Sequence, residues 1–141
     1  MNQLKKRFPG FTLLELLVVI SIIGILVAMG AVAFTTAQKK GRDSKRRGDM
    51  QSIQQAFEQY YAANSTYAVS CSTMASAHMP GGLPADPKPG QSYSTVCGLA
   101  AYCVCALLED TGSGNAGTPN GTSTCNYGGA PKNYFCTSSL Q

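Results

Sequence analysis

The apolar residues of this chain are concentrated in one uninterrupted run near the amino terminus. Residues 16–34 are nineteen consecutive positions without a charged side chain. A helix of that length, rising 1.5 Å per residue, nearly matches a hydrocarbon core of about 30 Å. The run therefore predicts a helix that can span a bilayer, and it is preceded by the basic residues Lys5, Lys6 and Arg7.

A second, amphipathic pattern follows the apolar run. Met50, Ile53, Phe57 and Tyr60 are spaced i, i+3, i+7 and i+10, which places them on one face of a helix. We expect a helical rod over residues 11–63, about 80 Å long at 1.5 Å per residue, whose second half supports a globular domain.

Glycine is a poor helix former, so two glycines in the second half of the rod are expected to bend it. They are Gly41 and Gly48.

The remaining residues, 64–141, predict a small extracellular domain with one clear strand. All six cysteines lie here, and so short a segment needs disulfides to supplement its core. Residues 102–108 alternate, with Tyr102, Val104, Ala106 and Leu108 on one face of the strand. We expect this apolar face to cover the helical stripe.

Six cysteines allow 15 pairings, which the sequence cannot choose among. Cys103 and Cys105 point to the same face of the strand, so each is expected to pair elsewhere. We favour a bond between Cys125 and Cys136, because the residues between them suit a turn. The disulfide candidates are Cys71, Cys97, Cys103, Cys105, Cys125 and Cys136.

Charge divides the chain into two unequal parts. Residues 1–47 contain nine Lys or Arg against two acids, whereas residues 48–141 contain two against five. The basic stretch 39–47 suits lipid phosphates, and nucleic-acid binding is possible but not favoured because no aromatic residues are interleaved. Counting basic residues would place the carboxyl end in the cytoplasm, but the cysteines favour an oxidising compartment.

Two interpretations of the apolar run compete. In the first, it is a secretory signal peptide, since Ala31-Val32-Ala33 fits a signal-peptidase site. This alternative releases a soluble, disulfide-bonded binding domain after Ala33. In the second, the run stays in the protein, because it is long for a signal peptide and Glu15 lies at its amino-terminal edge. A carboxylate there suggests a specific partner.

The residues Gly10-Phe11-Thr12-Leu13-Leu14-Glu15, between a basic leader and a long apolar run, resemble the cleavage and methylation motif of type IV pilins and type II secretion pseudopilins. The resemblance implies that prepilin peptidase cuts after Gly10 and that Phe11 is N-methylated. It also implies that Glu15 pairs with the amino-terminal amine of a neighbouring subunit during assembly.

The same resemblance implies an α+β fold, in which a long amino-terminal helix packs on a small disulfide-bonded antiparallel sheet. The expected parts are a leader (1–10), a membrane-spanning or filament-core half-helix (11–34), an amphipathic half-helix (35–63) and a cysteine-rich β domain (64–141). Residues 83–87 and 102–109 also resemble the globular part of major pseudopilins.

The implied function is that of a structural subunit of a type IV pilus or a type II secretion-like filament. Its expected partners are other copies of itself or other pilins, the prepilin peptidase and N-methyltransferase, the inner-membrane assembly platform, and the lipid bilayer. The resemblance implies a single-pass protein of the cytoplasmic membrane, with its carboxyl-terminal domain outside, that later enters a surface filament.

Enzymatic activity, cofactors and metal sites are not expected. The lone His78 has no nearby acid in sequence, and Cys-x-Cys without a second matched pair lacks a usual zinc spacing. Major pseudopilins bind calcium through a carboxyl-terminal loop, and residues 110–115 offer oxygen ligands. Acids are scarce there and the EF-hand pattern is missing, so calcium after Asp110 is possible but a flexible loop is favoured.

Overall fold

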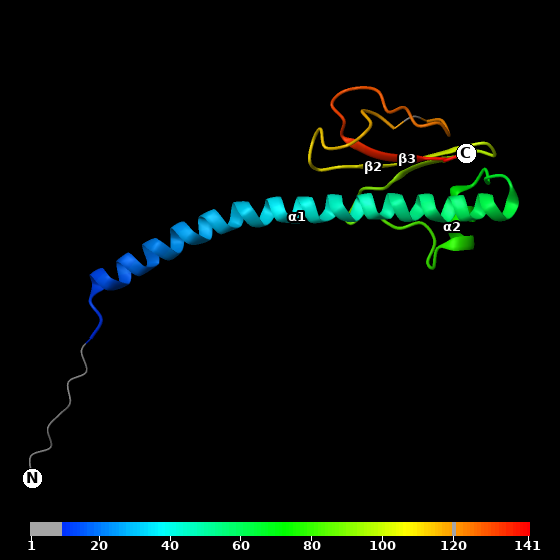
Figure 1. Ribbon diagram of the computed structural model, residues 1–141. Helices are drawn as coiled ribbons and strands as arrows, with labels where there is room; N and C mark the ends of the chain where they lie inside the picture. The colour runs from blue at the N-terminus through cyan, green and yellow to red at the C-terminus, as the bar shows by residue number, and fades with distance from the viewer. Residues whose placement is uncertain (1–9, 120) are drawn as a thin grey trace, which may run out of the picture. The chain divides into compact units, whose positions relative to one another are not determined.

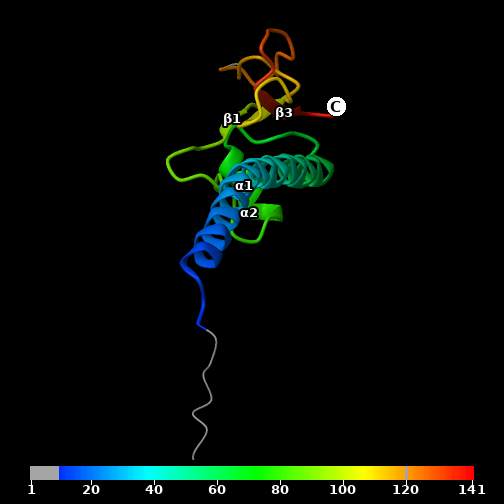
Figure 2. The ribbon, with the colours of Figure 1, turned by 90° about the vertical axis from the view of Figure 1, so that its left-hand side faces the viewer.

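The computed structural model describes residues 10–119 and 121–141 and divides them into two compact units, one ending at Ala37 and the other running from Gln38 to Gln141. Its helices are α1 (Leu13–Asn64) and α2 (Cys71–His78), and its strands are β1 (Ser94–Cys97), β2 (Tyr102–Leu107) and β3 (Tyr134–Ser138). The second unit packs the sheet and α2 around the latter part of α1 (Figures 1 and 2). The predicted α+β fold is confirmed.

The amphipathic half of α1 buries its apolar face as predicted. Met50, Ile53 and Phe57 are fully buried, and Tyr60 packs at the edge of the same cluster. The helix ends at Asn64 because Ser65 adopts a left-handed φ of 58° while its N–H still bonds to the carbonyl of Tyr61 at 2.7 Å.

Neither Gly41 nor Gly48 interrupts the helix, because α1 is helical through both positions. Asp43 and Arg46 between them are buried against the rest of the second unit, as is Met50 just beyond. The burial of these side chains offsets the intrinsic cost of about 1 kcal/mol that each glycine imposes on a helix.

The three strands form one antiparallel sheet in the order β1-β2-β3. The face of β2 carrying Tyr102, Val104 and Ala106 joins the α1 cluster, as the alternation predicts. The rings of Phe57 and Tyr102 meet edge to face with centroids 4.9 Å apart, a favourable aromatic geometry. Helix and sheet therefore share one core.

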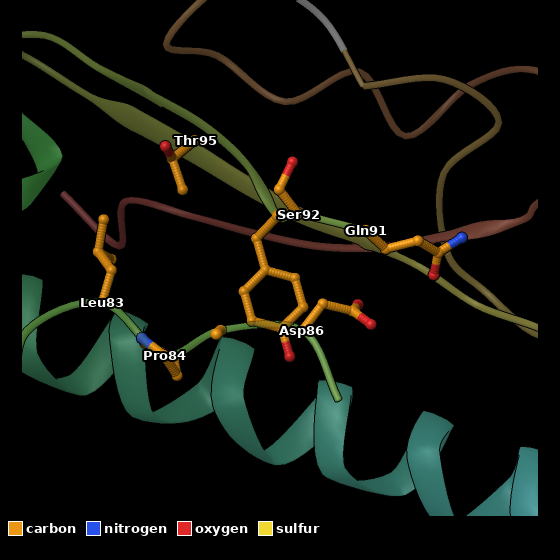
Figure 3. A pocket seen from close by; sticks show the side chains of 8 residues that line it. Leu83, Pro84, Asp86, Gln91, Ser92 and Thr95 are labelled. Atoms are coloured by element: carbon orange, nitrogen blue, oxygen red, sulfur yellow. The ribbon is translucent and has the colours of Figure 1, made fainter. Parts of the chain in front are cut away.

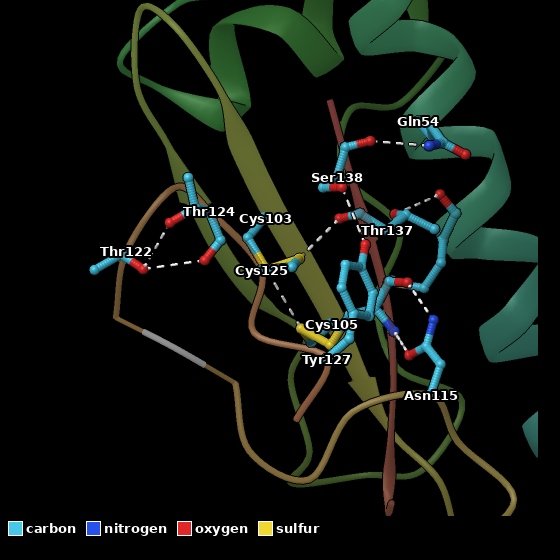
Figure 4. The surroundings of a disulfide bond; sticks show 12 residues. Gln54, Cys103, Cys105, Asn115, Thr122, Thr124, Cys125, Tyr127, Thr137 and Ser138 are labelled. Carbon is cyan, nitrogen blue, oxygen red and sulfur yellow. Dashed lines mark hydrogen bonds between the residues drawn. A yellow bond between two sulfur atoms is a disulfide. The ribbon is translucent and has the colours of Figure 1, made fainter. Parts of the chain in front are cut away.

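The opposite face of β2 carries the cysteines. The structure joins Cys103 to Cys125 and Cys105 to Cys136, so each of the β2 cysteines does pair outside its own strand (Figure 4). The predicted bond between Cys125 and Cys136 is wrong. Cys105 and Cys136 face each other across the β2–β3 ladder with Cα atoms 4.1 Å apart, and this register takes Cys136 away from its neighbour in sequence.

The short helix α2 is not apparent from the periodicity of the sequence. It turns Met74 and Ala75 into the core, and Cys71 at its start is bonded to Cys97 at the end of β1. Only eight residues long, it is held by burial and this disulfide rather than by its own propensity.

Candidate functional site

The candidate assembly segment is the apolar first part of α1. Every apolar side chain larger than alanine between Phe11 and Phe34 is at least 47% exposed within this single chain. By length and composition, α1 contains a stretch able to cross a membrane. So large an apolar surface must be covered by lipid or by other protein, because soluble single chains rarely expose such a patch.

The residues expected at the processing site lie just before this helix. Gly10 and Phe11 are both exposed and precede the first helical residue, Leu13. The basic residues Lys5, Lys6 and Arg7 lie outside the described residues. Cleavage after Gly10 and methylation of Phe11 therefore stay predictions.

Glu15 closes a hydrogen-bonded cap at the start of α1. Its Oε2 accepts bonds from the backbone N–H and the hydroxyl of Thr12, both at 2.9 Å. In return, the Glu15 N–H donates to the Thr12 hydroxyl oxygen at 3.2 Å. This is the reciprocal capping box of a Thr followed three residues later by Glu. The spacing of Thr12 and Glu15 in the sequence is a signal for this cap, although we predicted only a pairing role for Glu15.

The basic stretch 39–47 separates into two groups of side chains. Lys39, Lys40 and Lys45 are exposed. The arginines instead bind other parts of the second unit, and the guanidinium of Arg46 is completely buried. A buried guanidinium cannot reach a lipid or nucleic-acid phosphate, so only part of the predicted basic surface is available to either partner.

Arg46 is the centre of a buried polar network. Its Nε and Nη2 donate to the two carboxylate oxygens of Asp86, each at 2.8 Å. Nη1 donates to Asp43 at 2.8 Å, and Nη2 also donates to the side-chain oxygen of Gln91 at 2.8 Å. This bidentate geometry is the strong form of the Arg–carboxylate pair. It joins α1 to the connection between α2 and β1.

The network extends to the loop after β2. The Nη2 of Arg42 donates to Glu109 at 2.8 Å, and the Asp43 carboxylate accepts the backbone N–H groups of Glu109 and Asp110 at 2.9 Å each. Residues far apart in sequence thereby fix one segment of α1 against two loops. No sequence spacing indicates such partners, because they meet only in the tertiary fold.

Interactions within the network favour the ionised forms of its carboxyl groups. The hydrogen bond from Arg42 lowers the pKa of Glu109 from 4.5 to about 2. Burial alone would raise the pKa of Asp86, but the bonds from Arg46 bring it below its ordinary value. Both carboxylates therefore favour the folded state once ionised.

A cavity of about 200 Å³ lies beside this network. Figure 3 shows Asp86 and Gln91 on its wall, with Leu83 and Pro84 from the same connection. Asp86 and Gln91 already bind Arg46, so these two polar side chains are engaged.

The loop considered for calcium is also tied to its surroundings. The carbonyl oxygen of Ser113 accepts a bond from Arg47 at 2.6 Å, and the side chain of Asn115 bonds to the backbone of Cys136 through both its amide atoms. A guanidinium at Ser113 disfavours a cation there. His78, the lone histidine, is exposed and lies edge-on to Tyr60.

Comparisons with known proteins find similarity over part of the chain. Residues 5–31 match the family model described as the prokaryotic N-terminal methylation motif. The type IV major pilin protein PilA of Myxococcus xanthus (strain DK1622) is 28% identical to this chain over 67 residues. The chain is therefore similar to type IV pilins over part of its length.

The alignment with the Myxococcus pilin covers 48% of this chain and 30% of the relative's length. No solved structure matches the chain. The predicted resemblance to type IV pilins is confirmed. The pilin-like helix agrees with membrane anchoring and a surface filament.

Proposed function

We propose that this chain is a structural subunit of a type IV pilus or type II secretion-like filament, inserted in the membrane and cleaved after Gly10. The observation that carries the proposal is the exposed apolar first part of α1, most of which lies within the match to the methylation motif. A helix that is apolar on all sides is stable in lipid and can be transferred to a bundle of identical helices. The subunit polymerises through this helix.

In this proposal, Glu15 has a second partner in the filament. Both of its capping bonds use Oε2, and Oε1 has no hydrogen bond within residues 10–119 and 121–141. Oε1 is therefore free to meet the cationic amine that cleavage creates at Phe11 of a neighbouring subunit. Buried among apolar helices, an unpaired charge costs several kcal/mol, whereas a matched pair offsets much of that cost.

The proposal also covers topology and partners. The prepilin peptidase removes residues 1–10 and the methyltransferase modifies Phe11, after which an assembly platform in the inner membrane extracts the subunit. The disulfide-bonded unit lies outside the cytoplasm, where oxidised cysteines persist. The rival, a soluble domain released after Ala33, is less well supported because residues 31–33 lie inside the continuous helix α1.

Mass spectrometry of the mature amino terminus distinguishes the two. We expect N-methyl-Phe11, whereas a chain beginning at Phe34 would establish the secreted domain and refute the filament subunit.

Two variants then separate the cap from the pairing. Glu15→Gln keeps a side chain that can close the capping box but removes the charge, and Thr12→Ala removes the cap hydroxyl but keeps the charge. We expect Glu15→Gln to lose surface filaments at a normal level of processed subunit, and Thr12→Ala to retain them. The opposite result would show that Glu15 acts only as a helix cap.

A further inference from the structure

Four of the six cysteine sulfurs gather at one point on the outer face of the sheet. Cys103 and Cys105 come from β2, Cys136 from β3, and Cys125 from the connection between β2 and β3 (Figure 4). The four Sγ atoms all lie within 4.8 Å of one another, and those of Cys103 and Cys105 are 3.7 Å apart. Two separate disulfides thus form one four-sulfur cluster.

These separations are close to those of a tetrahedral thiolate site. A zinc–sulfur bond of about 2.3 Å places neighbouring sulfurs of a tetrahedron about 3.8 Å apart. Cys103 and Cys105 already stand at nearly that distance. The two bonded pairs would each have to open by about 2 Å, which is within the reach of side-chain rotation and a small loop movement.

Three of the sulfurs are held in place and the fourth can adjust. Cys103, Cys105 and Cys136 are each 2% exposed and lie on strands whose register the β2–β3 ladder fixes. Cys125 is only partly buried and belongs to a segment without helix or strand. It therefore provides both the required movement and the route by which an ion would enter.

We propose that the reduced chain binds one Zn²⁺ ion through the thiolates of Cys103, Cys105, Cys125 and Cys136, as an alternative to the two disulfides. This site does not depend on the filament function. Four sulfur ligands in tetrahedral reach select zinc among the common divalent ions. The sequence spacing alone argues against a zinc site, because the second pair of ligands is assembled only by the fold.

The zinc-bound thiolates and the two disulfides cannot exist at the same time, because they use the same four sulfur atoms. Metal binding releases the thiol protons and transfers no electrons. Conversion of the four thiols to two disulfides removes four electrons and four protons, which pass to two molecules of a disulfide oxidant, each of which is reduced to a dithiol. Oxidation therefore expels the ion, and bound zinc protects the thiols from oxidation.

The disulfide that lies outside the four-sulfur cluster provides a control for this proposal. The third disulfide, Cys71–Cys97, lies with the core cluster on the side of the sheet that faces α1, and it contributes no sulfur to the four-sulfur group. The double substitution Cys71→Ser with Cys97→Ser removes a disulfide but no proposed ligand. Cys105→Ser with Cys136→Ser removes a disulfide and two ligands.

The experiment uses the full chain in detergent, reduced anaerobically with a phosphine, which takes up one oxygen atom from water for each disulfide opened. Titration with Co²⁺ as a spectroscopic probe should give one ion per chain, with intense sulfur-to-metal bands that Zn²⁺ displaces. The Cys71/Cys97 variant should keep these bands and the Cys105/Cys136 variant should lose them.

Alkylation supplies an independent readout. In reduced wild type, Zn²⁺ should protect four of the six thiols, leaving Cys71 and Cys97 to react. The proposal is overturned if all six thiols react with zinc present, if no stoichiometric band forms, or if both double variants bind equally.

Discussion

Replacement of Arg46 by methionine tests the buried network that joins α1 to the rest of the second unit. Methionine keeps much of the side-chain length but removes the guanidinium. Asp86, whose carboxylate is 2% exposed, would lose its bidentate partner, and Asp43 would lose its ion pair. Breaking a buried ion pair by removing one partner costs about 3–5 kcal/mol, because the remaining charge is left uncompensated.

This loss is a large part of a typical folding free energy of about 5–15 kcal/mol. With a urea dependence of about 1–3 kcal/mol per molar, the unfolding midpoint should fall by about 1 M or more. The transition can be followed by near-ultraviolet circular dichroism of the tyrosines, since the chain has no tryptophan. The matched control is Lys45→Met, which changes an exposed residue on the same helix and should shift stability by less than about 0.5 kcal/mol.

The reasoning would be refuted if Arg46→Met moved the midpoint no further than Lys45→Met. A second variant distinguishes loss of the ion pair from simple mispacking. Asp86→Asn, combined with Arg46→Met, removes the orphaned charge and should restore part of the lost stability. No recovery in the double variant would attribute the effect to packing instead.

Three further predictions concern pH, disulfides and processing. Because the pKa of Glu109 is lowered to about 2 from 4.5, its stabilisation is complete above about pH 4.5 and lost as pH falls toward 2; urea titrations across that range should show a flatter profile for Glu109→Gln. Replacing Cys71 and Cys97 by serine opens a loop with a sequence separation of 26 and should cost roughly 3.5 kcal/mol in the chain-entropy model, measured by the same unfolding assay. A bulky residue at Gly10 should block cleavage, so the unprocessed precursor should accumulate in the membrane on immunoblots; normal processing would contradict the prepilin assignment.

Several parts of this protein can be understood from its sequence because their determinants are local. The apolar run, the amphipathic stripe at Met50, Ile53 and Phe57, and the alternation in β2 all depend on periodicity, which short-range geometry imposes on neighbouring residues. The motif around Gly10 and Glu15 is equally local, and it led to the pilin-like assignment.

The tertiary structure alone decided the contacts that join distant segments. Arg46 looks like one more solvated cation in a basic stretch, yet the fold buries it against Asp86, 40 residues away. Cys136 is near Cys125 in sequence, but the register of β2 and β3 places it opposite Cys105. Such pairings follow from how whole elements pack, because one packed arrangement must satisfy burial, register and charge together. The spacing of residues along the sequence does not indicate that arrangement.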